Sequence, residues 1–368
     1  MNILAVNPGS SSLKFGLFRF PEPSRNVLTG VIAPFSADDP ARAVRETITR
    51  IEGRTINAVG CRIVHGGSTY SAATIIDRSV LEQIRQLGAL APLHNPMAAL
   101  LVEALRESLP DLPVVAVFDT AFHRTLPAIA WRYAVPEEVG IRRYGFHGIS
   151  YAWVSSRLAE HAGTGRRVII CHLGNGASIC ALLDGVSVDT SMGLTPMEGL
   201  PMGTRSGDID PGALLYLLRR GWSEVALDEM LNRRSGLFGL AGGRSDMREL
   251  EKAASEGDVR AGLAIDIFSY RIAKYVGSYA AALGGLDCLA FTGGIGEHSS
   301  VVRERVCERL AFLGVRLDES ANRALQTEER RISRGKVAVF VIPANEECQI
   351  ARETHALLSA HSPATPQR

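Results

Sequence analysis

Two segments of the chain repeat one pattern of strand, small-residue turn and strand. The first, Ile3–Phe18, reads ILAVNPGSSSLKFGLF, and the second, Val168–Leu183, reads VIICHLGNGASICALL. Each opens one half of a 368-residue chain, which is long enough for two domains. Two hairpins with glycine- and serine-bearing turns can face each other and hold a polyphosphate through backbone N–H groups. A coincidental pair of hairpins is the alternative, because hairpins of this kind are common.

Strand-like runs alternate with helical patterns along the whole chain, which predicts an α/β fold. Aspartate or asparagine followed by proline, at Asp39, Asn95 and Asp210, marks three helix starts. The predicted strands cover residues 3–6, 15–18, 58–64, 114–118, 168–172, 178–183, 288–291 and 337–342. The predicted helices cover residues 41–51, 97–108, 211–220, 261–283 and 301–313.

The charge balance argues against several classes of protein. Forty Lys and Arg residues against thirty-nine Asp and Glu residues leave a formal net charge of +1, so a nucleic-acid partner has no electrostatic support. No uncharged run is long enough to cross a bilayer, and the N-terminus lacks the basic start and apolar region of a signal peptide. We therefore expect a protein without a membrane partner.

Six cysteines lie far apart and mostly within apolar runs. They form no Cys-x-x-Cys pair, and neither they nor the nine histidines have the spacing of zinc ligands. We expect buried free thiols in a reducing cytoplasm.

The turn of the first hairpin is rich in polar side chains that suit phosphate oxygens and a Mg²⁺ water shell. These are Asn7, Ser10, Ser11, Ser12 and Lys14. A solvated Asn-Pro-Gly turn is the alternative interpretation. The turn is not a Walker loop, because the required Gly-Lys-Ser/Thr ending is absent.

Three isolated polar residues each allow two interpretations. Arg62 lies in the apolar run VGCRIV and needs an anionic partner, either a ligand or an internal carboxylate. Asp119 ends a predicted strand, where α/β folds bind ligands, but it could equally cap the next turn. His147, between Phe146 and Gly148, could donate to a developing phosphoryl charge or be a satisfied core histidine.

Two further segments look functional. The stretch Asp189–Pro211 carries acids, hydroxyls and Arg205 among glycines and is too irregular for a helix or strand. Arg205 there resembles an anion clamp. Residues 289–299 predict a strand, a glycine loop and a helix, and their spacing fits a nucleoside on glycine backbone better than a dinucleotide fingerprint.

Taken together, these segments closely resemble the acetate kinase family, part of the acetate and sugar kinase, Hsc70 and actin superfamily. The resemblance runs nearly end to end. It rests on the motifs NPGSSSLK (7–14), RIVHGG (62–67), PLHNP (92–96), FDTAFH (118–123), RRYGFHG (142–148), CHLGNG (171–176), the 189–211 segment, SDMR (245–248), TGGIGE (292–297) and NEE (345–347).

The resemblance implies an α/β fold of two duplicated ribonuclease-H-like (actin-like ATPase) domains with an interdomain active-site cleft. Residues 1–123 and 348–368 would form the N-terminal domain with a returning C-terminal helix, and 124–347 the nucleotide-binding domain. The implied reaction is reversible, Mg²⁺-dependent transfer of the ATP γ-phosphoryl group to acetate, giving acetyl phosphate and ADP. We favour direct in-line transfer, because the carboxylate nucleophile is already ionised at neutral pH. Mn²⁺ is the alternative ion.

The resemblance also assigns roles to individual positions. Asp119, His147 and Arg205 correspond to the catalytic residues, and Asn7 and Glu346 to the metal-site residues. The substrate-binding positions are Arg62, Val64, Leu93, Phe146 and Pro196. The cofactor-binding positions are Ser12, Lys14, His172, Leu173, Gly174, Asn175, Gly176, Asp246, Met247, Arg248, Gly294, Ile295, Gly296, Glu297 and His298.

Two departures from the family pattern concern nucleotide preference and rate. Tyr151 stands where the family commonly has a second histidine, and His298 replaces a usual asparagine. The small acyl pocket leaves a propionate- or butyrate-preferring kinase as an alternative, since one methylene is worth only about 1–3 kcal/mol. An actin- or chaperone-like ATP-binding switch is the alternative from another class. The resemblance further implies a homodimer in the cytoplasm.

Overall fold

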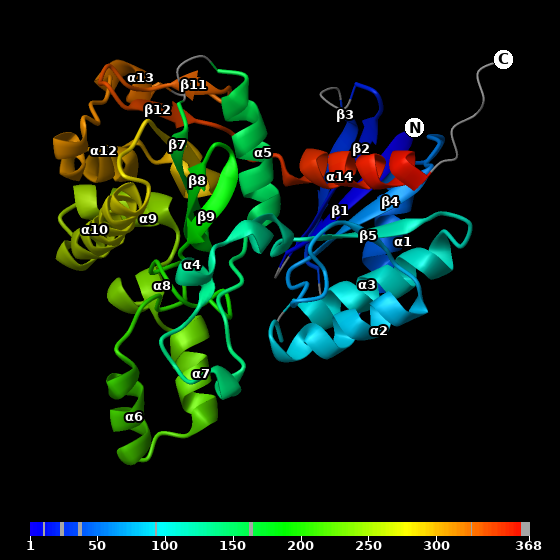
Figure 1. The fold of residues 1–368 in the computed structure, drawn as a ribbon, viewed down its shortest axis with the longest axis horizontal. Helices are drawn as coiled ribbons and strands as arrows, with labels where there is room; N and C mark the ends of the chain where they lie inside the picture. Colours follow the sequence, from blue (N-terminus) through cyan, green and yellow to red (C-terminus); the bar gives the residue numbers. More distant parts are fainter. Residues whose placement is uncertain are drawn as a thin grey trace. The chain divides into compact units, whose positions relative to one another are not determined.

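The computed structural model describes residues 1–9, 12–22, 26–35, 39–92, 94–161, 165–324 and 326–361. They group into two compact units, each built around its own β-sheet (Figure 1). The first unit comprises Met1–Arg124, Phe146–Trp153 and Asn345–Arg368, and the second comprises Thr125–Gly145 and Val154–Ala344. The chain thus leaves the first unit twice and returns to it twice.

The sheet of the first unit has six strands in the order β3-β2-β1-β4-β6-β5. The strands are β1 (Asn2–Pro8), β2 (Leu13–Arg19), β3 (Asn26–Ile32), β4 (Ala58–Ile63), β5 (Thr74–Ile75) and β6 (Val114–Phe118). Strands β1 to β3 form an antiparallel meander, β1, β4 and β6 run parallel, and β5 is antiparallel to β6. The parallel strands β1, β4 and β6 therefore end at one common edge.

Helices cover both faces of this sheet, and β4 shows why. Val59, Cys61 and Ile63 belong to the core shared with helix α1 (Pro40–Arg50), helix α2 (Arg78–Gln86) and helix α3 (Asn95–Ser108). Gly60 faces the other way, because successive strand residues alternate between faces. A Cβ at Gly60 would collide with helix α14 (Glu346–His361), which lies against β1 and β4 (Figure 1).

The second sheet repeats the first. Its strands are β7 (Arg167–Leu173), β8 (Ala177–Leu183), β9 (Val186–Thr190), β10 (Cys288–Thr292), β11 (Arg330–Arg331) and β12 (Ala338–Val341). Starting from the edge strand β9, the order is β9-β8-β7-β10-β12-β11. Antiparallel and parallel pairs follow one another in the same sequence as in the first sheet. The predicted α/β class and its duplication, first indicated by the two similar hairpins, are confirmed.

Ten further helices complete the chain's described part, and one of them, α5, has residues in both units. They are α4 (Ala128–Trp131), α5 (Gly148–Ala159), α6 (Pro211–Arg219), α7 (Glu224–Arg233), α8 (Gly236–Leu240), α9 (Met247–Ser255), α10 (Val259–Ala282), α11 (Gly293–His298), α12 (Ser300–Arg309) and α13 (Glu319–Arg323). Short 3₁₀ turns cover Leu87–Ala89, Ala121–Thr125, Glu137–Val139 and Ala311–Leu313.

Two of the three predicted helix caps are confirmed. The Asp39 side chain accepts from the Arg42 N–H (2.9 Å), and Asp210 accepts from the Gly212 N–H (2.8 Å). Asn95 instead lies inside α3, and its amide exchanges two hydrogen bonds with the backbone of His65. That tertiary contact satisfies a side chain that would otherwise compete for the helix N-terminus.

Other predictions need correction. Strands β3, β5, β9 and β11 were not expected; β5 and β11 have two residues each, too few for a visible period. The glycine run after β10 is not a loop but the helix α11, which begins at Gly293 with a positive φ of 76°. In the irregular segment, Asp189 and Thr190 close β9, and residues 191–210 are without helix or strand.

All six cysteines are buried and free, as expected. Burial raises the pKa of the Cys61 and Cys288 thiols to about 12, so both stay protonated at neutral pH. Among the described residues, no helix combines the length and the apolar character that a membrane crossing demands.

Candidate active site

In the first unit, three neighbouring parallel strands bring three polar side chains to one edge. Asn7 is the penultimate residue of β1, Arg62 the penultimate residue of β4, and Asp119 directly follows β6. The Arg62 guanidinium donates to Asp119 Oδ2 through Nε (2.9 Å) and Nη2 (2.6 Å), and through Nη1 to Asn7 Oδ1 (3.1 Å). The partner of Arg62 that the sequence left open is thus an internal carboxylate.

The first turn of α14 adds two carboxylates to this cluster. The amide of Asn7 donates to Glu346 Oε2 and to Glu347 Oε1, both at 2.8 Å. Glu347 was not among the predicted site residues. The signal was present in the sequence, since Glu347 follows Glu346 in the same NEE motif.

The charges in this cluster are strongly coupled. Burial opposes the charge of Arg62, but the carboxylates of Asp119 and Glu346 outweigh burial and raise the pKa of the guanidinium. Burial, opposed by Arg62 and reinforced by Glu346, raises the pKa of Asp119 to about 6. Asp119 is 1% exposed, and its Oδ1 has no hydrogen-bond partner. A buried acceptor of this kind is stabilised when a cation or donor binds.

The donor set fits a divalent cation of the hard type. Glu346 and Glu347 each offer a carboxylate beside Asn7, and the unpartnered Asp119 Oδ1 lies in the same cluster. Among the described positions, no group of three or more His, Cys, Asp and Glu side chains is arranged so that it could hold a metal ion. Mg²⁺ is typically held by one or two carboxylates together with substrate phosphates and water, so these residues suit it.

His147 precedes helix α5, whose first turn contacts Asp119. His147 is a non-glycine residue with φ of 57°, a conformation that is uncommon and is enriched at functional sites. The Gly148 N–H donates to the Asp119 carbonyl (2.9 Å). A Cβ at Gly148 would overlap the Asp119 carbonyl oxygen, so glycine is required there. The structure therefore brings His147 and Asp119 to one helix start.

The residues predicted for the acyl pocket do not all lie in one unit. Val64 and Phe146 are both buried in the first unit, where Phe146 packs edge-on against His65. Pro196 belongs to the second unit, and Leu93 lies outside the described residues. Tyr151 is fully buried, with its ring edge-on to His123 at 5.6 Å between centroids.

A backbone hydrogen bond closes the hairpin turn of each unit. Ser12 accepts from the Gly9 N–H through its carbonyl (2.8 Å), and the exposed Lys14 pairs in register with Asn7. In the second unit the Gly174 N–H donates to the Gly176 carbonyl (3.0 Å). His172 and Leu173 end β7 just before that turn.

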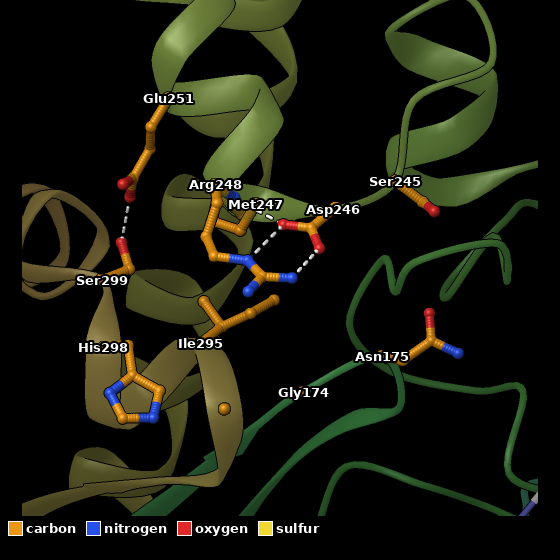
Figure 2. A pocket seen from close by; sticks show the side chains of 11 residues that line it. Gly174, Asn175, Ser245, Asp246, Met247, Arg248, Glu251, Ile295, His298 and Ser299 are labelled. Atoms are coloured by element: carbon orange, nitrogen blue, oxygen red, sulfur yellow. Dashed lines mark hydrogen bonds and ion pairs between the residues drawn. The ribbon is translucent and has the colours of Figure 1, made fainter. Parts of the chain in front are cut away.

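A cavity of about 520 Å³ opens in the second unit where the β7–β8 turn, the start of α9 and α11 converge (Figure 2). This volume is ordinary for a small-molecule site. Of its lining residues, Gly174, Asn175, Asp246, Met247, Arg248, Gly294, Ile295 and His298 were predicted. Ser245, Glu251 and Ser299 also line it and were missed, whereas His172, Leu173, Gly176, Gly296 and Glu297 do not line it.

Polar groups around this cavity are ordered by hydrogen bonds (Figure 2). Asp246 caps α9 and binds the Arg248 guanidinium, which lowers the pKa of the Asp246 carboxyl to about 2. Ser299 donates to Glu251, which lies one turn after Arg248 on the same helix face. That spacing was the available signal for Glu251.

A buried arginine supports the α11 wall of the cavity from behind. Arg303, 1% exposed, donates through Nη1 to the carbonyls of Gly296 and Glu297, each at 2.9 Å. Its Nε and Nη2 donate to the side chain and backbone of Asn322. Arg303 thereby satisfies the carbonyls at the end of α11, a role that sequence reasoning missed.

Arg205 lies in the loop of residues 191–210 of the second unit. Its Nη1 donates to the Pro196 carbonyl at 2.8 Å, and the Arg205 carbonyl accepts from the Met202 N–H at 3.0 Å. The Gly203 N–H donates to the Asn175 carbonyl (2.9 Å), which joins this loop to the β7–β8 turn. The loop of residues 191–210 and one wall of the cavity are therefore continuous.

Comparison with known proteins places these features in a family. Residues 41–352 match the model of the Acetokinase family. An acetate kinase of Shouchella clausii is 45% identical over 97% of this chain and 99% of its own length. Solved structures that resemble the chain include an acetate kinase of Porphyromonas gingivalis, with a TM-score of 0.87, 39% identity and coverage of 97% and 99%. A propionate kinase of Francisella tularensis has a TM-score of 0.86, 40% identity and coverage of 96% and 98%.

Proposed function

Because the chain belongs to the acetokinase family, we propose that it transfers the ATP γ-phosphoryl group reversibly to acetate, giving acetyl phosphate and ADP. The observation that carries this proposal is the buried cluster of Arg62, Asp119 and Asn7. A protein that only binds nucleotide has no need of a guanidinium held at a strand edge in this way. A carboxylate substrate does need one, since its charge must be matched on leaving water.

Each unit supplies part of the chemistry. In the first, Arg62 would hold the acetate carboxylate and His147, in its strained conformation, would donate to the phosphoryl oxygens in flight. In the second, the 520 Å³ cavity would take adenosine, and Arg205 would clamp the transferring group. Phosphoryl transfer asks mainly for positioning and charge neutralisation, which these groups provide.

Asn7, Glu346 and Glu347 would hold Mg²⁺, with Mn²⁺ as the alternative. When bound, the ion neutralises charge on the phosphoryl oxygens. Asp119 keeps Arg62 oriented, because two of the guanidinium nitrogens bind its Oδ2. No strong general base is needed, since acetate is already ionised.

We infer direct in-line transfer without a phosphoenzyme. Inversion of configuration at a chiral γ-phosphate is the expected outcome, and retention would refute direct transfer.

Propionate is the second candidate substrate. A similar solved structure is named a propionate kinase, and Val64 and Phe146 offer only apolar contacts to an acyl chain. Discrimination by one methylene is about 10- to 200-fold in such pockets.

The deciding experiment measures ADP release from Mg·ATP with acetate, propionate, butyrate or no carboxylate. Carboxylate-dependent turnover, trapped as the hydroxamate, with acetate first in kcat/KM is the expected result. ATP binding without carboxylate-dependent turnover would favour a nucleotide switch instead. The homodimer stays a prediction, which light scattering on the eluting protein tests.

A further inference from the structure

The loop that carries Arg205 has no strand or helix of its own between residues 191 and 210. A clamp on a loop is precise only where other groups fix its backbone. Arg205 Nη1 donates to the Pro196 carbonyl (2.8 Å), so the position of this carbonyl must be fixed if it is to orient the guanidinium.

The segment around Pro196 is held on both sides by one tyrosine. Tyr133 accepts from the Leu194 N–H at 3.0 Å and donates its own hydroxyl hydrogen to Glu198 Oε2. Pro196 lies midway between Leu194 and Glu198. Gly193 leaves no room for a side chain, because a Cβ there would overlap Glu198 Oε2 and the Tyr133 hydroxyl.

Arg143 ties the same segment to the sheet. Its Nη1 donates to the carbonyls of Thr190 (3.1 Å), at the end of β9, and Met192 (3.0 Å). Its Nη2 forms an ion pair with Glu198 Oε1. The side chains of Arg143 and Glu198 are 16% and 31% exposed, so this partly buried pair is screened less than a surface ion pair. Both oxygens of Glu198 are therefore engaged, one by Tyr133 and one by Arg143.

We propose that Tyr133 and Glu198 are positioning residues for Arg205. They fix the Pro196 carbonyl, and this carbonyl fixes the direction of the Arg205 guanidinium. The inference rests on the proposed role of Arg205 in phosphoryl transfer. Neither Tyr133 nor Glu198 needs to touch a substrate for this effect.

Tyr133→Phe is the main test, because it removes only the hydroxyl. We expect kcat with acetate to fall about 10- to 100-fold, since small misplacements of a catalytic group have effects of this size. The dissociation constant of ADP, which reports on the cavity, should change by less than about twofold. The matched control is Tyr216→Phe on the exposed face of α6, which should leave kcat unchanged.

Glu198 supplies a second test based on rescue. Glu198→Ala removes both acceptors, whereas Glu198→Gln keeps an oxygen for the Tyr133 hydroxyl. We expect Gln to recover part of the kcat lost in Ala, at equal ADP affinity. A kcat of Tyr133→Phe within about twofold of wild type would overturn the inference, as would kcat losses matched by equal losses of ADP affinity. A wild-type protein without carboxylate-dependent turnover would contradict the proposed function itself.

Discussion

At the scale of single residues, the site depends on a buried ion pair that is incompletely satisfied. Arg62 donates two hydrogen bonds to one oxygen of Asp119, and the other oxygen has no hydrogen-bond partner. Burial of a charged pair is unfavourable unless its remaining bonds are met. The arrangement is better explained by ligand binding than by stability.

The pH dependence of activity should report on Asp119, whose pKa is raised to about 6 by burial. Above that pH the carboxylate is ionised and the Arg62 contact is complete; below it the proton weakens the contact. We expect kcat/KM for acetate to decline as pH falls through about 6. In Asp119→Asn this decline should be absent, at a lower overall rate.

The folding contribution of the same group has the opposite sign. The folded state holds the proton more tightly than an unfolded aspartate with a pKa of about 3.9. Its contribution to stability therefore decreases as pH rises from about 4 to 6 and is constant above. For the activity profile, a rise in kcat/KM for acetate as the pH falls below about 6 would contradict the assignment of this profile to Asp119.

At the scale of elements, helix starts and ends position the reactive groups. The first N–H of helix α5 donates to the backbone carbonyl of Asp119, and the guanidinium of Arg303 donates to the last carbonyls of α11. The periodicity and capping patterns of the sequence predict neither of these two contacts. The sequence predicted a glycine loop at 293–296, because the pattern does not show that Arg303 turns back to satisfy the carbonyls of Gly296 and Glu297 in a helix there.

Gly148→Ala should displace the start of α5. Its new methyl group would overlap the Asp119 carbonyl, so we expect a loss of about 1–3 kcal/mol in unfolding free energy and a lower kcat. Gly262→Ala in α10 is the matched control, because open space surrounds that position. The control should be stabilised by up to about 1 kcal/mol. Chemical denaturation of both variants checks the contrast; equal stabilities would exclude the close contact.

Arg303→Gln should weaken nucleotide binding, because Arg303 supports α11, which lines the cavity. The shorter amide cannot reach both the Gly296 and Glu297 carbonyls and Asn322. We expect roughly a 10-fold weaker ADP affinity, with the KM for acetate little changed. Calorimetric titration with ADP measures this. Arg305→Gln, a partly exposed neighbour on α12 that pairs with Asp266, serves as control, and equal affinities in the two variants would contradict the supporting role.

At the scale of the whole molecule, α14, the last helix of the described residues, covers one face of the sheet of the first unit. Helix α14 packs on β1 and β4 and brings Glu346 and Glu347 to Asn7, more than 300 positions earlier. The 520 Å³ cavity that we propose for the nucleotide is lined entirely by residues of the second unit. Stability of the first unit and nucleotide binding by the second should therefore respond differently to loss of this helix.

Truncation after Ala344 tests that expectation. Without α14, the face of β4 at Gly60 is uncovered, and amides of β1 and β4 should lose most of their protection from hydrogen exchange. Peptides from α9, α10 and β10 of the second unit provide the internal reference and should keep theirs. Uniform loss, or no loss, across both sets would show that α14 is not specific to the first sheet.

The sequence alone determined the α/β class, the duplication, most strands, and the polar residues at the ends of β1, β4 and β6. Of the fourteen helices in the described residues it predicted six, α14 by resemblance and the others, α1, α3, α6, α10 and α12, by local pattern. These follow from local periodicity, caps and motif resemblance, which depend on neighbouring residues. Tertiary structure decided the partner of Arg62, the place of Glu347, the support from Arg303 and Tyr133, and the inclusion of Phe146–Trp153 in the first unit. Most of these contacts join residues more than fifty positions apart, and the energy of all of them depends on burial that only the folded chain creates.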